Sequence, residues 1–206
     1  TDFDGTMKIK GREVRLRSAR DALANSIGMV HQELSIVPDL TVAENVFLGN
    51  QPLTALGTVD WGRMKREEKQ LIASLLTGQV GKWDSVMVGK PGSLKPLTDF
   101  ASGAITDSKV HICRRTNGSG TQATINAKIL NAPCTAGALD PVETSNDLAG
   151  PIVKLNAGSG DVERCLVDFN AGSNTSGQNA GATKAFAIGV QSTERNPSNA
   201  LAYRFI

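Results

Sequence analysis

The sequence is poor in the features that nucleic-acid and membrane partners require. Aromatic side chains make up 4% of the 206 residues, too few for the stacking platforms that bind single-stranded nucleic acid. The net charge is only +2, so no strong electrostatic field attracts nucleic acid or anionic lipid. No apolar run approaches the roughly 18 to 20 residues that a membrane-spanning helix needs. We therefore expect no nucleic-acid partner and no membrane span.

Metal-ligating and redox residues are also scarce. The chain has two histidines, His31 and His111, and three cysteines, Cys113, Cys134 and Cys165, none of which form a CxxC pair. This spacing does not match a zinc site, so we expect no metal and no cofactor. The cysteines are either three small buried side chains or one disulfide and one free thiol, which would indicate an oxidising compartment.

A catalytic set of residues is missing as well. Neither histidine has a serine or cysteine nucleophile in a recognisable arrangement, and acidic pairs such as Glu67 and Glu68 fall on a charged helix face. We expect no catalytic residue and predict that the chain is not an enzyme. Residues 1–5 (TDFDG) are polar and acidic and do not resemble a signal peptide. The start at Thr1 indicates a processed, trimmed or engineered chain, and the compartment stays open.

Composition and periodicity divide the chain into two parts. The first 75 residues hold many of the charges, whereas residues 76–206 are rich in Gly, Ser, Asn and Thr. We place the boundary between Glu67 and Thr77 and predict two domains, residues 1–72 and 73–206. Strands alternate with helices in both, so the expected class is α/β, with mixed sheets flanked by helices.

Local patterns predict the individual elements. In the first part we expect a hairpin around Gly11, a helix over residues 61–76, helix starts at 18–21 and 41–44, and a strand at 27–30. In the second part we expect strands at 110–113, 185–190 and 202–206, and helices at 122–130 and 161–169, with Asp161 as an N-cap. We expect a polar loop between Ala171 and Thr183, and the stretch from Asn170 to Asn179 is predicted to be a flexible surface connection.

Three stretches of the first part carry a family resemblance. Residues 5–14 (GTMKIKGREV), 27–34 (IGMVHQEL) and 40–49 (LTVAENVFLG) resemble the ATP-binding subunit of sugar-import ABC transporters. The resemblance covers about residues 5–75 and implies that Gln32 lies in a loop that senses the nucleotide's magnesium. However, no GxxxxGKS or GxxxxGKT phosphate loop, no signature motif and no apolar run ending in Asp-Glu occurs. We expect this part to be a fragment without its phosphate loop, which the family would place before Thr1.

The second part resembles a different class of transport protein. Residues 76–84 (LTGQVGKWD), 113–121 (CRRTNGSGT) and 187–194 (AIGVQSTE) resemble the phosphate-binding class of periplasmic substrate-binding proteins. This resemblance covers about residues 70–206 and implies one periplasmic-binding-protein-like lobe beside a partial ABC-ATPase-like segment. It implies a periplasmic location for this part, and relatives of this kind can hold a disulfide, for which Cys134 and Cys165 are the candidates.

The loop after the strand at 110–113 is the candidate anion site. The strand delivers Arg115, whose guanidinium suits a tetrahedral oxyanion, and the glycines of the following turn allow close backbone approach. Ser119 and Thr121 supply hydroxyl groups and Gly120 a backbone N–H, beside the N-terminus of a helix. Arg114 is the alternative ligand, because alternation along a strand sends the two arginines to opposite sides.

Three functions follow as alternatives. The leading one is a non-catalytic, ABC-transporter-related chain that binds inorganic phosphate or a similar oxyanion weakly, since the other lobe of a receptor is absent. The second is a partial nucleotide-binding module of a sugar ABC importer. The third is a recombined, chimeric domain without inherited function. Exposed strand edges would favour a homodimer.

Overall fold

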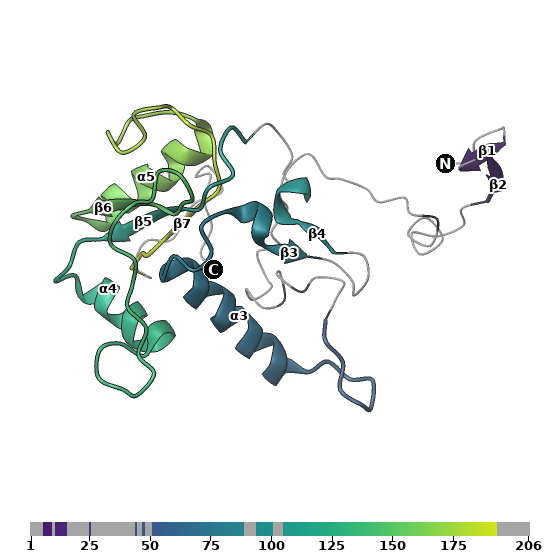
Figure 1. Ribbon diagram of the computed structural model, residues 1–206, viewed down its shortest axis with the longest axis horizontal. Helices are drawn as coiled ribbons and strands as arrows, with labels where there is room; N and C mark the ends of the chain where they lie inside the picture. The colour runs from purple at the N-terminus through teal and green to yellow at the C-terminus, as the bar shows by residue number, and fades with distance from the viewer. Residues whose placement is uncertain are drawn as a thin grey trace.

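The computed structural model describes residues 6–9, 11–15, 25, 44, 47, 51–88, 94–100 and 105–192. Its centre is a three-stranded sheet in the order β6-β5-β7, formed by β5 (His111–Arg115), β6 (Ile152–Asn156) and β7 (Ala187–Gly189). All three strands are parallel (Figure 1). The first four residues of the central strand are buried, as expected for a parallel strand covered on both faces.

Helices cover both faces of this sheet (Figure 1). On one face lies α5 (Ser159–Ala171), whose Val162, Cys165 and Phe169 are buried against Cys113. On the other face lie α3 (Trp61–Leu76) and α4 (Gly120–Ile125), which continues as the π-helical turn η3 (Asn126–Leu130). The core on this side holds the buried side chains of Leu75, Leu76, Trp83, Val110, Ile112, Leu130 and Val153. The expected α/β class, with a sheet flanked by helices, is confirmed.

Helix α3 forms over the predicted residues. The Asp60 carboxylate accepts a hydrogen bond from the backbone N–H of Arg63 at 2.9 Å, which caps the helix start. Leu71 and Ile72 pack against the buried cluster around Leu75. Trp61 is 49% exposed, because it begins the helix, several turns away from the end that meets the core. The predicted domain boundary at 72/73 falls inside this continuous helix.

The smaller elements are short. The predicted hairpin around Gly11 is confirmed as antiparallel β1 (Met7–Ile9) and β2 (Arg12–Val14), with Gly11 at φ 79°. Beside the core lie the 3-10 turns η1 (Trp83–Ser85) and η2 (Leu97–Phe100) and the paired strands β3 (Met87–Val88) and β4 (Lys95–Pro96). The elements expected at 18–21, 27–30 and 202–206 lie outside the described residues, as does most of 41–44.

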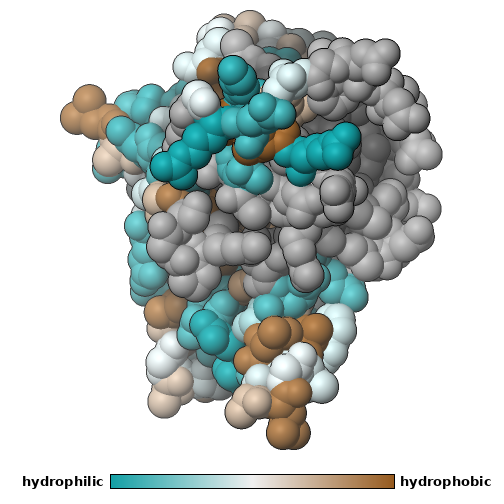
Figure 2. All heavy atoms as spheres, turned by 90° about the vertical axis from the view of Figure 1, so that its right-hand side faces the viewer, coloured by the Kyte–Doolittle hydropathy of each residue, from teal (hydrophilic) through white to brown (hydrophobic). Residues whose placement is uncertain are grey.

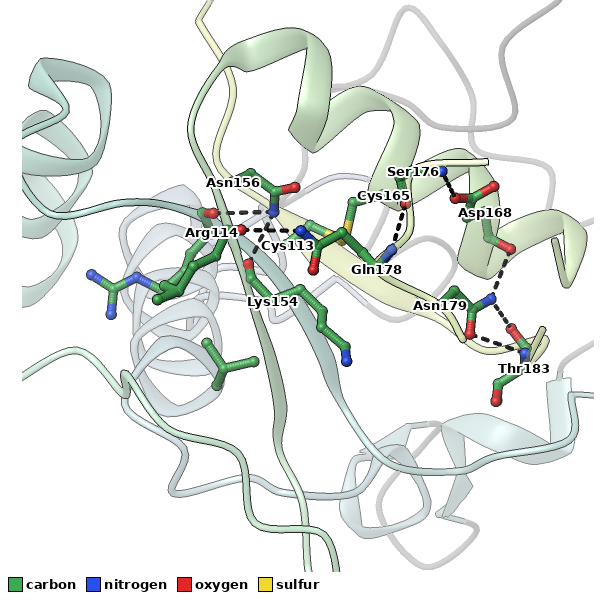
Figure 3. Close-up of a disulfide and its surroundings, with 12 residues drawn as sticks. Cys113, Arg114, Lys154, Asn156, Cys165, Asp168, Ser176, Gln178, Asn179 and Thr183 are labelled. Atoms are coloured by element: carbon green, nitrogen blue, oxygen red, sulfur yellow. Dashed lines mark hydrogen bonds between the residues drawn. A yellow bond between two sulfur atoms is a disulfide. The ribbon is translucent and has the colours of Figure 1, made fainter. Parts of the chain in front are cut away.

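A disulfide joins Cys113 of β5 to Cys165 of α5, and Cys134 is free and exposed (Figure 3). The pairing of Cys134 with Cys165 considered from the resemblance is therefore wrong. The physical reason is strand alternation: Cys113 points toward the face that α5 covers, where Cys165 is fully buried.

The segment after α5 is also more ordered than a flexible connection. The buried Asp168 carboxylate accepts hydrogen bonds from Ser173, Thr175 and Ser176. The buried Asn179 amide donates to the carbonyl oxygens of Asp168, Ser173 and Thr183. The loop lies at the surface, as expected, and two buried polar side chains hold it in place at both ends.

Large hydrophobic side chains remain on the surface near the start of α3. Leu53 is 60% and Leu56 91% exposed. Figure 2 shows hydrophobic atoms gathered at the lower end of one face, where Figure 1 draws the segment that precedes α3. Among the helices of the described ranges, none combines the length and apolarity needed to cross a membrane.

Candidate oxyanion site at the carboxyl edge of the sheet

Two strands of the parallel sheet end side by side and lead into two helices. Arg115 at the end of β5 is the register partner of Asn156 at the end of β6. After β5 the chain turns at Gly118, whose φ is 90°, and enters α4. After β6 it passes directly into α5, capped at Gly158. In parallel sheets this edge is where ligands bind, because loops and helix N-termini converge there.

Arg115 bridges the two loops. Its Nη1 donates to Ser159 Oγ and its Nη2 donates to the Ala157 carbonyl oxygen, both at 2.8 Å. The third donor, Nε, is buried and has no hydrogen-bond partner among the residues that the structure describes. The guanidinium thus has a fixed position and one unused donor at the carboxyl edge.

Arg114 points to the other side of β5 and is 2% exposed. Its guanidinium donates to Val142 O at 2.8 Å and to Asn117 Oδ1 at 3.0 Å, and it lies 3.5 Å from the Glu143 carboxylate. Burial lowers the pKa of Arg114, and the charge of Glu143 partly opposes that shift. Each terminal nitrogen of Arg114 already has a partner, so its role is to hold neighbouring loops, whereas Arg115 keeps an unused donor.

The remaining residues of the predicted loop lie at the start of α4. Ser119 is the N-cap, and its Oγ accepts from the backbone N–H of Gln122 at 3.4 Å. Gly120 and Thr121 form the first turn, and a Cβ at Gly120 would have open space around it. Gln122 connects this turn to β5, because its Oε1 accepts from the backbone N–H of Arg115 at 3.1 Å.

Sequence reasoning missed three polar residues at this edge. Ser159, rather than Ser119, is the serine that Arg115 contacts. The Asn156 amide nitrogen donates to the carbonyl oxygens of Arg114 and Lys154 (Figure 3), but its Oδ1 is buried and unpartnered. Both polar atoms of the Gln191 side chain, two residues after β7, are also buried and have no partner among the described residues. Strand β6 itself was not predicted, so its register with Arg115 could not be foreseen.

The structure corrects the expected position of Asp161 at the start of α5. Gly158 is the N-cap of α5, and Asp161 stands three residues later, where its Oδ2 accepts from the backbone N–H of Gly158 at 2.8 Å. The carboxylate therefore still caps the helix start, but from within its first turn, as in a capping box.

Within the described ranges no cluster of three or more metal-ligating side chains occurs. Gln32 lies outside the described residues.

Comparison with known proteins identifies relatives for about a third of the chain. A ribose import ATP-binding protein of Caldanaerobacter subterraneus is 40% identical over 72 residues, which is 35% of this chain and 14% of the relative. The ribose import ATP-binding protein of Rhodopirellula baltica is 43% identical over 72 residues, which is 35% of this chain and 14% of the relative. That of Streptomyces avermitilis is 45% identical over 69 residues, which is 34% of this chain and 13% of the relative. The chain thus spans about 14% of the length of these curated relatives. No family model and no solved structure matches.

These relatives confirm one sequence interpretation and overturn another. Part of the chain, about 35%, resembles ATP-binding subunits of sugar-import ABC transporters, as expected. The prediction that the chain is not an enzyme is wrong at the level of this resemblance, because the relatives are ATP-binding proteins of import systems. That prediction relied on motifs that are absent from the sequence, but the chain matches only about 14% of the length of these relatives, so the absence does not decide the point. Nothing in these comparisons shows a phosphate-binding protein segment or a chimera.

Proposed function

We propose that the chain carries a partial nucleotide-binding module of a sugar ABC importer. The observation that supports this most is the 40 to 45% identity to ribose import ATP-binding proteins over 69 to 72 residues. The segment for which the sequence alone gave this resemblance, residues 5–75, has a similar length. In this proposal Gln32 belongs to the loop that senses the nucleotide's magnesium.

Thermal unfolding with Mg-ATP tests this module. Because the sequence contains no glycine-rich phosphate loop, we expect a dissociation constant of about 1 mM, and about 10 mM Mg-ATP would then stabilise the fold by about 1.4 kcal/mol. Gln32→Ala should abolish the increase in Tm. Gln79→Ala, a change at an exposed glutamine just after α3, should leave it intact. The proposal fails if Mg-ATP has no effect, or if both variants respond like the unchanged chain.

We propose, as a second function, weak binding of inorganic phosphate or a similar oxyanion by Arg115, Ser119, Gly120 and Thr121. The unused Nε donor of Arg115 favours this site, as does its position at the carboxyl edge of the parallel sheet between the starts of α4 and α5. An oxyanion there would accept a charge-assisted hydrogen bond from Nε. Backbone N–H groups of the first turn of α4 would complete its coordination.

A titration with phosphate, monitored by calorimetry, tests this site separately from the nucleotide module. We expect a dissociation constant of about 1 mM or weaker, because one open loop lacks a second wall. Arg115→Met should remove binding. Arg164→Met removes an arginine of α5 whose side chain is 57% exposed and pairs with Asp161, and it should bind phosphate like the unchanged chain. Equal affinity of the two variants would exclude Arg115 as the phosphate ligand.

A further inference from the structure

A cavity of about 210 Å³ lies at the amino end of the sheet, away from the carboxyl edge that holds Arg115. It is lined by the start of β5, by β6, by the end of α5 and by the loop after α5. The side chains that matter for its chemistry are Asp107, His111, Lys154, Phe169, Asn179 and Thr183. Asp168 and Asn179 hold the loop wall in place through their buried hydrogen bonds, so the cavity is formed before any ligand enters.

His111 provides an unused hydrogen-bond acceptor beside this cavity. Its side chain is buried, with the ring centroid 4.2 Å from that of Phe169. Its Nε2 lies 3.2 Å from Asp107 Oδ2. A carboxylate only accepts hydrogen bonds, so Nε2 carries the proton and Nδ1 of the neutral ring is an acceptor. Nδ1 is buried and has no partner within the described part of the chain, although buried polar atoms are nearly always hydrogen-bonded.

The ring is neutral at pH 7 for a physical reason. Burial lowers the pKa of His111, and although Asp107 raises it, the positive charges of Lys109 and Lys154 lower it further. Burial raises the pKa of Asp107, but the hydrogen bonds from the Lys109 backbone and the His111 ring, together with the charge of Lys109, outweigh burial, so the pKa falls below its usual value. The pair at pH 7 is therefore a carboxylate and a neutral imidazole.

Lys154 supplies the charge for a ligand. It is the register partner of Cys113 and so shares the α5 side of the sheet with His111. Figure 3 shows its ammonium group pointing away from the Asn156 amide, toward the side where Gln178 and Thr183 lie. Lys109 is 3.6 Å from Asp107, but Lys154 makes no ion pair or side-chain hydrogen bond with any described residue. The charged side chains of the cavity lining are Asp107 and Lys154. Because Lys109 pairs with Asp107 from outside the lining, the positive charge of Lys154 is left for a ligand.

We propose that this cavity binds a small carboxylic acid that also carries a hydroxyl group. Lys154 holds the carboxylate, and Nδ1 of His111 accepts a hydrogen bond from the hydroxyl. A water molecule occupies about 30 Å³ in the liquid, so a cavity of about 210 Å³ has room for a small organic ligand such as a two- to three-carbon hydroxy acid. The cavity shares no residue with the proposed oxyanion site around Arg115 or with the loop that contains Gln32. Its test is therefore independent of both proposed functions.

An NMR titration of the His111 ring tests this site directly. The full chain has only two histidines, so the variant His31→Gln leaves a single imidazole signal in a ¹H–¹³C spectrum. Glycolate should shift that signal saturably, with a dissociation constant of about 1 mM or tighter. Acetate, which has the same charge but no hydroxyl, should bind at least about tenfold more weakly, because it leaves Nδ1 unpaired. Equal affinity for the two acids, or no shift with glycolate, would overturn the proposal.

Two lysine variants on the His31→Gln background separate the site from non-specific charge effects. Lys154→Met should abolish the glycolate-dependent shift. Lys128→Met, at an exposed position of η3, should preserve it. Far-UV circular dichroism and Tm establish that both variants remain folded. Unchanged glycolate affinity in Lys154→Met would contradict the proposal. An equal shift of the His111 signal by inorganic phosphate would also contradict it, because the site would then recognise only the negative charge of a ligand.

Discussion

At the scale of single residues, Asp168 shows how one carboxylate organises a loop. It is fully buried at the end of α5. It accepts hydrogen bonds from Ser173 Oγ, from the N–H and Oγ1 of Thr175 and from the N–H of Ser176, at 2.6 to 2.8 Å. Burial raises the pKa of this carboxyl group, but the hydrogen bonds outweigh burial and hold the pKa well below its usual range.

This lowered pKa predicts a pH-dependent stability. In the unfolded chain the group titrates near pH 3.9, so its contribution is fully present above that pH and is lost as pH falls toward the folded pKa. Asp168→Asn should lower the free energy of unfolding by about 2 kcal/mol at pH 7, and the difference from the unchanged chain should shrink between about pH 4 and pH 2. Urea unfolding at several pH values measures this.

The exposed Asp147 provides the matched control for that experiment. Asp147→Asn should change stability by less than about 0.5 kcal/mol at any of these pH values. A constant difference between Asp168→Asn and the unchanged chain from pH 7 to pH 2 would show that the hydrogen bonds do not depend on the carboxylate charge.

At the scale of elements, the disulfide between β5 and α5 stabilises the sheet against its covering helix. The two cysteines are 52 residues apart in sequence, and a loop of this size predicts a stabilisation of about 4 kcal/mol in the chain-entropy model, which is an upper estimate. Cys113→Ala with Cys165→Ala should therefore lower Tm strongly. A reductant should lower the Tm of the unchanged chain but not that of the double variant.

Cys134→Ser is the control, because Cys134 is exposed and unpaired. It should leave the response to reductant unchanged. Alkylation without reductant should label one thiol in the unchanged chain and none in Cys134→Ser. Labelling of three thiols in the native, air-oxidised chain would contradict the pairing.

The outer edge of β6 is blocked by side chains, which affects the proposed homodimer through strand edges. Ser145 Oγ accepts from Val153 N at 2.8 Å and donates to Val153 O at 3.2 Å, and Gln178 Nε2 donates to Leu155 O at 3.3 Å. Such capping prevents edge-to-edge pairing. Ser145→Ala with Gln178→Ala should tighten self-association about tenfold, or 1.4 kcal/mol, in sedimentation velocity. Ser145→Thr keeps the hydroxyl group and should not tighten self-association. Equal association of the unchanged chain, the double variant and Ser145→Thr would exclude β6 as the dimer edge.

The elements that could be predicted from sequence are those with local signals. Periodicity predicts α3, and glycine-rich turns mark the end of β5 and the start of α5. β6 was missed because its five residues (IVKLN) follow Gly150 and Pro151, so only its pairing with β5 identifies it. The partner of Arg115 and the pairing of Cys165 depend on which residues of neighbouring strands share a face. That information is tertiary, and no local pattern contains it.

At the scale of the whole molecule, the division into residues 1–72 and 73–206 stays a prediction that two fragments can test. A cut at 72/73 leaves four residues of α3, too few for a helix, and removes Leu71 and Ile72 from the core. It also removes Lys69, whose Nζ donates to Asn131 Oδ1 at 3.4 Å. We expect fragment 51–206 to be about 2 to 4 kcal/mol more stable than fragment 73–206, measured by urea unfolding. Equal unfolding midpoints would instead support a boundary at 72/73, with the first part of α3 belonging to the preceding segment.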